Sequence, residues 1–237
     1  MHQNDSLTKV DFSVFPNLER LEVDFIRSQN LQTINTGYIT EISNRYVEGA
    51  AYIGSIFTSS KSITGDSRSG DDTTPNLQQI ICPNVRRINR TGLAETGARE
   101  IYLPKVVYIL AYMIRHAPNL NLMYVGKDVQ YIHNKMFDGD AREYPSEFSF
   151  VLNCATPPTV FTNVDDAADM TTFSFTQGSF GGNATGRMWI YVPDSSLNAY
   201  KTHACWSNVS SRFKPMSELD STTVNKITSI TNDTLLT

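Results

Sequence analysis

The sequence feature that most constrains the fold is a short apolar pattern that the chain repeats in register. Residues 80–88, 101–109 and 123–132 superimpose with one inserted residue, and the isoleucines that end the three copies follow one another after 21 and 23 residues. A repeat of roughly 20 to 50 residues is typical of a solenoid, because one turn cannot bury its apolar face alone and must stack on its neighbours. The chain is therefore expected to form a stack of short strands.

Flanking residues extend the pattern toward both ends of the chain. The tripeptide Pro-Asn-Leu stands before two copies of the repeat, at 75–77 and 118–120, and a third at 16–18 leads into Leu21-Glu22-Val23, which fits the same template. Ile190-Tyr191-Val192-Pro193 repeats the sequence of residues 101–104 almost letter for letter. One right-handed stack that reaches Trp206, without a second domain, is predicted from the matched positions at 18–23, 77–88, 98–109, 120–132 and 190–193.

Alternation along each short strand divides its residues between the core and the outer face. The residues expected to point inward are Ile80 and Cys82, Ile101 and Leu103, and Met123 and Val125. The residues expected to point outward, away from the core, are Ile81, Tyr102, Tyr124, Asn153 and Tyr191, and a second matched position holds Arg87, Tyr108 and Tyr131. Tyrosine suits recognition, since it offers a large rigid apolar ring with a hydroxyl at its end, although any single tyrosine also simply suits a half-exposed strand. The candidate binding residues are Tyr102, Tyr124, Tyr191, Tyr108, Tyr131 and Arg87.

Two further segments make the resemblance to a known family specific. Residues 152–159 read Leu-Asn-Cys-Ala-Thr-Pro-Pro-Thr, and residues 190–195 are followed by Ala199-Tyr200-Lys201 and Trp206. Both segments, with the repeats, resemble the BspA-type leucine-rich-repeat family of bacterial surface proteins. The resemblance implies a leucine-rich-repeat solenoid with irregular or helical returns, a secreted or cell-surface location, and adhesion to extracellular matrix or host cells. The Gly-x-x-Ala-Phe usual in each turn of the family is replaced here at 89–93, 110–114 and 133–137, so the repeats are degenerate.

The remaining segments are interpreted as a cap, insertions and an end. Asp194 or Ser195 can begin a short helix that carries Leu197, Tyr200 and Ala204 on one face and covers the last turn. Residues 58–74 and 161–187 are rich in Ser, Thr, Gly or Asp and are expected to be insertions. The solenoid domain is thus predicted over 1–215, with a polar tail or linker over 216–237.

Charge, hydropathy and cysteine content exclude several classes of protein. The 20 basic and 24 acidic residues give a net charge of −4, which argues against a nucleic-acid binder. The longest apolar run, 106–114, is too short for a membrane span, and residues 1–5 do not resemble a signal peptide. The three cysteines lack the spacing of a metal site and are predicted to be unpaired thiols, with Cys82 and Cys154 in inward strand positions and Cys205 near the capping helix.

Catalytic motifs receive little support, so no catalytic, cofactor-binding or metal-binding residue is predicted. The four histidines form no zinc motif, Gln177 stands where a nucleophile elbow needs glycine, and residues 138–140 lack the ligand spacing of an EF-hand. We therefore expect a non-enzymatic extracellular protein that recognises a host protein or a glycan through its strand face. The alternative is a polysaccharide-acting enzyme or enzyme accessory whose loop carboxylates act in a pocket formed by the 161–187 insertion.

Overall fold

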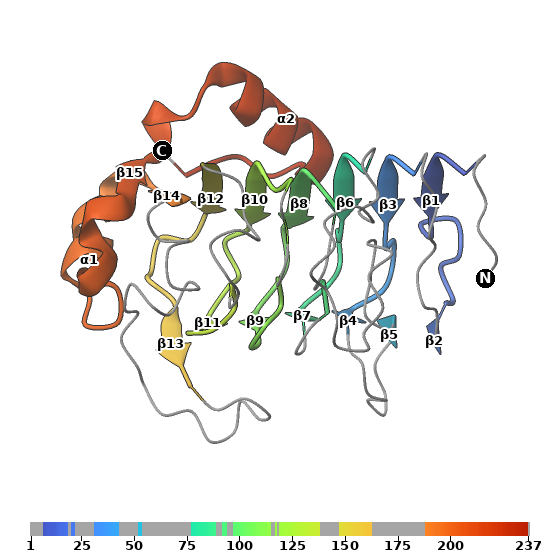
Figure 1. Ribbon diagram of the computed structural model, residues 1–237, viewed down its shortest axis with the longest axis horizontal. Coiled ribbons are helices and arrows are strands. Elements are labelled where there is room, and N and C mark those ends of the chain that lie inside the picture. The colour runs from blue at the N-terminus through green and yellow to red at the C-terminus, as the bar shows by residue number, and fades with distance from the viewer. Residues whose placement is uncertain are drawn as a thin grey trace, which may run out of the picture.

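The chain folds as a solenoid with two parallel β-sheets, sheet A and sheet B, which face each other across the core (Figure 1). The computed structural model describes residues 7–18, 20–21, 31–42, 52–53, 77–88, 92–93, 97–114, 117, 119–137, 147–162 and 188–236. Sheet A contains, in spatial order, β1 (Lys9–Asp11), β3 (Thr33–Asn35), β6 (Gln79–Ile81), β8 (Glu100–Leu103), β10 (Leu122–Val125), β12 (Phe148–Leu152), β14 (Met188–Val192) and β15 (Phe213–Pro215). Sheet B contains β13 (Thr159–Phe161), β11 (Tyr131–His133), β9 (Tyr108–Ile109), β7 (Arg87–Ile88), β4 (Glu41–Ile42), β5 (Tyr52–Ile53) and β2 (Arg20–Leu21).

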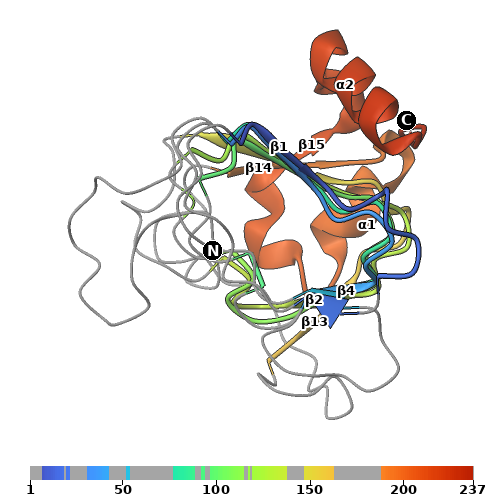
Figure 2. The same ribbon diagram turned by 90° about the vertical axis from the view of Figure 1, so that its right-hand side faces the viewer.

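The predicted register of the central repeats is confirmed. Ile80 pairs with Ile101, and Ile101 pairs with Met123, in neighbouring parallel strands of sheet A. All six residues expected to point inward are fully buried in one continuous core. That core also contains the isoleucine that ends each repeat, namely Ile88, Ile109 and Ile132, which lie in neighbouring strands of sheet B. Figure 2 shows strands of successive turns lying behind one another along the axis of the solenoid.

Two parts of the predicted register are wrong. Leu21 does not occupy a sheet A position, because β2 pairs with β5 in sheet B. The outward position of β12 belongs to Val151, which pairs with Tyr124 on one side and Tyr191 on the other, rather than to Asn153. The shift arises because β12 continues to Leu152, and Asn153 lies in the turn that follows the strand.

The end of the solenoid is covered by a short helical region, as predicted. After β14, the chain forms η5 (Asp194–Ser196), α1 (Leu197–Thr202) and η6 (Ser207–Arg212) before it returns to sheet A as β15. Trp206 is fully buried, and its indole Nε1 donates a hydrogen bond of 2.8 Å to the Pro158 carbonyl. Its ring packs edge-on against Tyr200 of the helix, which joins the cap to the core.

The segment 216–237, expected to be a polar tail or linker, instead packs on the solenoid. It forms η7 (Met216–Glu218) and α2 (Ser221–Thr231), and α2 begins where the Asp220 carboxylate accepts a hydrogen bond from the Thr223 amide. Figures 1 and 2 show α2 lying over sheet A, and the apolar side chains of this segment, Ile227 among them, pack against the outer face of that sheet. We call residues 216–236 the C-terminal segment.

Other sequence predictions concern the cysteines, the insertions and the membrane. All three cysteines are buried free thiols, as predicted, and Cys205 follows α1 closely. Cys82 and Cys154 point into the core but lie just after β6 and β12 rather than in these strands. Residues 58–74 and most of 161–187 lie outside the described residues. Among the helices that the structure describes, none is long and apolar enough to cross a membrane.

Candidate binding site

The aromatic column predicted on sheet A lies beneath the C-terminal segment. Tyr102 pairs with Tyr124 across β8 and β10, as the repeats predict. However, Tyr102 and Tyr124 are fully buried and Tyr191 is only 8% exposed, so the prediction that these rings lie outside any core is wrong. They form a second apolar cluster together with Ile227 and Leu235. An outward position on a strand faces solvent only if no other element covers that face, and here the C-terminal segment covers it.

Hydrogen bonds hold α2 over β8. The Tyr102 hydroxyl donates to the Glu100 carboxylate at 2.9 Å, and the Lys226 ammonium of α2 donates to the same carboxylate at 2.5 Å. Burial raises the pKa of Glu100, but hydrogen bonds from Lys226, Gln79 and Tyr102 outweigh that effect and hold this pKa below its ordinary value. Glu100 is therefore ionised and paired at neutral pH.

Asn153 ties the end of the C-terminal segment to the solenoid. Its buried side-chain amide donates to the Tyr124 hydroxyl at 2.9 Å and to the Thr234 carbonyl at 3.1 Å. Its carbonyl oxygen accepts a bond of 2.8 Å from the Leu236 amide. The Tyr124 hydroxyl in turn donates to Asp233 at 2.9 Å. The Tyr124 hydroxyl and the Asn153 side chain are thus bonded within the chain rather than presented to a ligand.

The second matched position forms a row on the outer face of sheet B, which we call the sheet B row. Tyr108 and Tyr131 are register neighbours and stack, with ring centroids 4.9 Å apart and an interplanar angle of 12°. The Arg87 guanidinium lies 5.5 Å from the centroid of the Tyr108 ring, and its Nε is 4.0 Å from the carboxylate of Glu41. Arg87, Tyr108 and Tyr131 are half-buried, and the structure brings them together as the repeats predict.

The stacking decides which parts of these tyrosines a ligand can reach. The centroid separation of 4.9 Å is close to the usual spacing of neighbouring strands, about 4.8 Å, so the two rings face each other along the solenoid axis. The ring surfaces that face each other are therefore closed to a ligand, whereas the half-buried side chains keep their remaining surface toward solvent. A ligand of the sheet B row would make hydrogen bonds and edge contacts with this pair.

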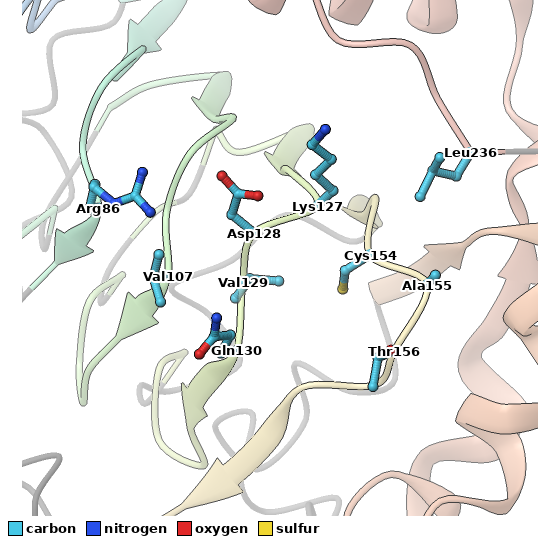
Figure 3. A pocket seen from close by; sticks show the side chains of 10 residues that line it. All are labelled: Arg86, Val107, Lys127, Asp128, Val129, Gln130, Cys154, Ala155, Thr156 and Leu236. Atoms are coloured by element: carbon cyan, nitrogen blue, oxygen red, sulfur yellow. The ribbon is translucent and has the colours of Figure 1, made fainter.

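A pocket of about 500 Å³ lies directly beside this row, at the corner where the chain passes from sheet A to sheet B (Figure 3). Arg86, Val107 and Gln130, which contribute to its lining, immediately precede the three residues of the row. The pocket falls within the range of roughly 300 to 1,000 Å³ that is common for small-ligand sites. Its lining residues are Arg86, Val107, Lys127, Asp128, Val129, Gln130, Cys154, Ala155, Thr156 and Leu236. We call this pocket and the sheet B row together the corner site.

The floor and rim of the pocket differ in polarity. Val107, Val129 and Cys154 are buried, whereas Arg86 and Lys127 are exposed. Neither the Arg86 guanidinium nor the Lys127 ammonium forms a hydrogen bond or ion pair with another described residue. In the view of Figure 3, the Asp128 carboxylate lies between them. An apolar floor beneath a few convergent polar groups is the usual composition of a ligand site.

The thiol in the pocket is not a reactive nucleophile. Burial raises the pKa of Cys154 to about 11 despite the hydrogen bond with the Tyr200 hydroxyl, which lies 2.8 Å from Sγ. Cys154 is therefore protonated at neutral pH, and the protonated thiol is a poor nucleophile. Its part in the pocket is to provide apolar surface.

Several residues of the site were not predicted from the sequence. Arg86, Lys127 and Thr156 lie in corner turns, where the repeat pattern does not show which side chains converge. Leu236 reaches the pocket only because the C-terminal segment is bound to Asn153. Arg86 and Lys127 stand at different positions of the repeat, since Arg86 corresponds to Val107 and Lys127 to Lys105, so the repeat pattern gives no signal for their convergence.

The alternative of an enzymatic site at the 161–187 insertion stays a prediction, because most of that insertion lies outside the described residues. Within the described part of the chain, no three side chains of His, Cys, Asp or Glu gather where they could hold a metal ion. The sequence matches no protein-family model, and it shows no significant similarity to a curated protein.

Proposed function

We propose that this protein is a non-enzymatic binding protein that recognises an acidic glycan at the corner site, rather than through the tyrosines of sheet A. The observation that carries the proposal is the pocket of about 500 Å³ with two cations that no described carboxylate pairs. Charge-assisted hydrogen bonds from Arg86 and Lys127 suit carboxylate or sulfate groups, and the apolar floor suits the faces of sugar rings. The edges and hydroxyls of Tyr108 and Tyr131 extend the surface on one side.

We further propose that the solenoid is a right-handed leucine-rich-repeat stack of the BspA type, located on the cell surface or secreted, with adhesion as its role. The repeated positions at 80–88, 101–109 and 123–132 support this assignment, as does the buried Trp206 of the closing motif. A host matrix protein is the other ligand that such a role allows. The experiment below distinguishes it from a glycan.

The proposal is tested on an array that carries both acidic glycans and matrix proteins, followed by titration of the best ligand. The combined substitution Arg86→Ala with Lys127→Ala is expected to weaken glycan binding by at least about a hundredfold, because hydrogen bonds to charged groups contribute about 1.5 to 3 kcal/mol each. Asp128→Asn should retain or strengthen binding, since it removes a negative charge from the rim. Lys105→Ala is the matched control, because Lys105 is an exposed lysine of the preceding corner that does not line the pocket.

The outcomes separate the alternatives. Loss of binding in the double variant, with full binding by the control, supports the corner site. Binding to matrix proteins alone, still lost in the double variant, keeps the site but changes the ligand class. Unchanged binding by the double variant refutes the site, and so does a stronger loss in Asp128→Asn than in the double variant.

A further inference from the structure

The two ends of the solenoid differ in how well they are covered. At one end, α1 and Trp206 close the core, whereas β1 is the edge strand of sheet A at the other (Figure 1). Val10 in β1 is half-exposed although its register neighbour Ile34 is fully buried. Val14 and Phe15 in the following turn are 67% and 56% exposed. In the part of the chain that the structure describes, the β1 end therefore presents both an open strand edge and apolar side chains.

The hydrogen bonds of β1 show which backbone groups point away from the sheet. The Thr8 carbonyl accepts from the Gln32 amide at 2.8 Å, and the Phe12 amide donates to the Asn35 carbonyl at 3.0 Å. Residues at positions 8, 10 and 12 thus bond toward β3, so the amides and carbonyls of Lys9 and Asp11 point toward the open edge. No described residue pairs with that edge.

The charges on this edge are complementary to those on the same edge of a second copy that runs in the opposite direction. Lys9 and Asp11 lie two residues apart on the outer face, and their side chains form an ion pair of 2.8 Å. Many natural edge strands avoid association by carrying charge. A strand with charges of a single sign would repel its own copy, but one cation and one anion on either side of Val10 attract a copy that runs in the opposite direction.

We propose that a second copy of this chain docks on the first through antiparallel pairing of the two β1 strands, with the two-fold axis at Val10. In this register, Lys9 of each copy lies opposite Asp11 of the other, and each such pair can exchange two backbone hydrogen bonds. Four backbone hydrogen bonds and two cross-strand ion pairs result, and sheet A continues from one copy into the next. Centring the pairing on Lys9 or on Asp11 places like charges opposite each other, which destabilises a sheet.

The apolar residues of this end fit the same arrangement. Val10 faces its counterpart across the axis on the core side of the sheet, where its exposed surface becomes covered. Leu7, Phe12 and Leu18, each only partly buried against the core, surround the same end of the solenoid. The isologous contact closes after two copies, as a two-fold interface does, and predicts a dimer rather than a filament.

Charge reversal tests this pairing on the full chain, with sedimentation velocity at several concentrations. Lys9→Glu and Asp11→Lys are each expected to raise the dissociation constant of the homodimer roughly tenfold or more, because each places like charges across the axis. An equimolar mixture of the two variants should associate again, since each reversed charge then lies opposite a charge of the other sign. Lys201→Glu, an exposed lysine at the opposite end, is the control and should leave association unchanged.

Three results would overturn the inference. The first is a wild-type chain that stays monomeric at concentrations up to about 100 µM. The free energy of dissociation of the homodimer would then be less than about 5 kcal/mol. The second is a dimer that both reversals leave intact, and the third is a failure of the mixed variants to associate. Circular dichroism of each variant checks that the fold is kept, which is expected because the Lys9 and Asp11 side chains are 60% and 26% exposed.

Discussion

Removing the ring of Tyr124 is expected to destabilise the protein strongly, because the C-terminal segment packs on that ring. The side chain is fully buried and its hydroxyl bonds to both Asn153 and Asp233. Truncation of a buried aromatic side chain to alanine costs about 3 to 5 kcal/mol. For a chain of this size, each kcal/mol shifts the Tm by about 2 to 4 °C, so Tyr124→Ala should lower the Tm by roughly 6 to 20 °C.

Two further variants show what causes the loss of stability. One removes only the Tyr124 hydroxyl, and the other removes an outward ring from sheet B. Tyr124→Phe keeps the ring and loses only the hydrogen bonds, so its cost should be about 1 to 2 kcal/mol. Tyr108→Ala is the matched control on sheet B, where the ring is half-buried and its stacking contributes about 0.5 to 1.5 kcal/mol beyond the buried area. We expect the Tm to be highest for the wild type and lowest for Tyr124→Ala.

Thermal and urea unfolding followed by circular dichroism measure the change, and hydrogen exchange locates it. Backbone amides of α2 should exchange faster in Tyr124→Ala, since local opening of this helix is opposed mainly by its contacts with sheet A. A Tm within about 1 °C of the wild type, together with unchanged exchange in α2, would refute the reasoning.

Three further predictions follow from buried or close contacts. Gly126→Ala should destabilise the stack by about 1 to 3 kcal/mol in urea unfolding, because a Cβ there would lie 1.9 Å from the Pro104 carbonyl oxygen and the two turns would have to separate. Trp206→Ala should cost about 3 to 5 kcal/mol by the same measurement, and an unchanged midpoint would show that the cap does not depend on the indole. The carboxyl pKa of Glu100 is lowered on folding, so its pairing with Lys226 stabilises the protein at neutral pH. This stabilisation is lost as the pH falls through the lowered pKa. Glu100→Gln should therefore reduce the loss of stability that the protein shows as the pH is lowered.

The central register of sheet A could be predicted because inward positions need apolar residues in every turn. The same reasoning could not show that Tyr102 and Tyr124 are buried. The sequence around an outward tyrosine looks the same whether a helix covers that face or water does. Ser, Thr and Asn make up 10 of the 21 residues of the segment that covers them, and only a narrow apolar stripe at Val224, Ile227 and Ile230 marks α2 as a packed helix. A narrow stripe suffices here because the other half of the contact consists of aromatic rings.

Sheet B and the corner site were harder to predict for a different reason. β7 and β9 contain two residues each, which is too short for alternation to show a strand. The row of Arg87, Tyr108 and Tyr131 was still found, because it stands at a fixed offset from the isoleucine that ends each repeat. The pocket beside it depends on turn geometry and on Leu236, a residue distant in sequence, and neither is encoded in the repeat.

The place of the C-terminal segment in the sequence has a consequence for synthesis. The N-terminal part of a chain leaves the ribosome first, so residues 216–236 emerge after all the strands that they cover. Until then, the face that carries Leu122, Tyr102 and Tyr124 stands open as a contiguous apolar patch, which favours association with other chains. A nascent chain that stalls before Met216 would expose that face for as long as it stalls, so chaperones that bind apolar surface should recognise stalled chains in preference to completed ones.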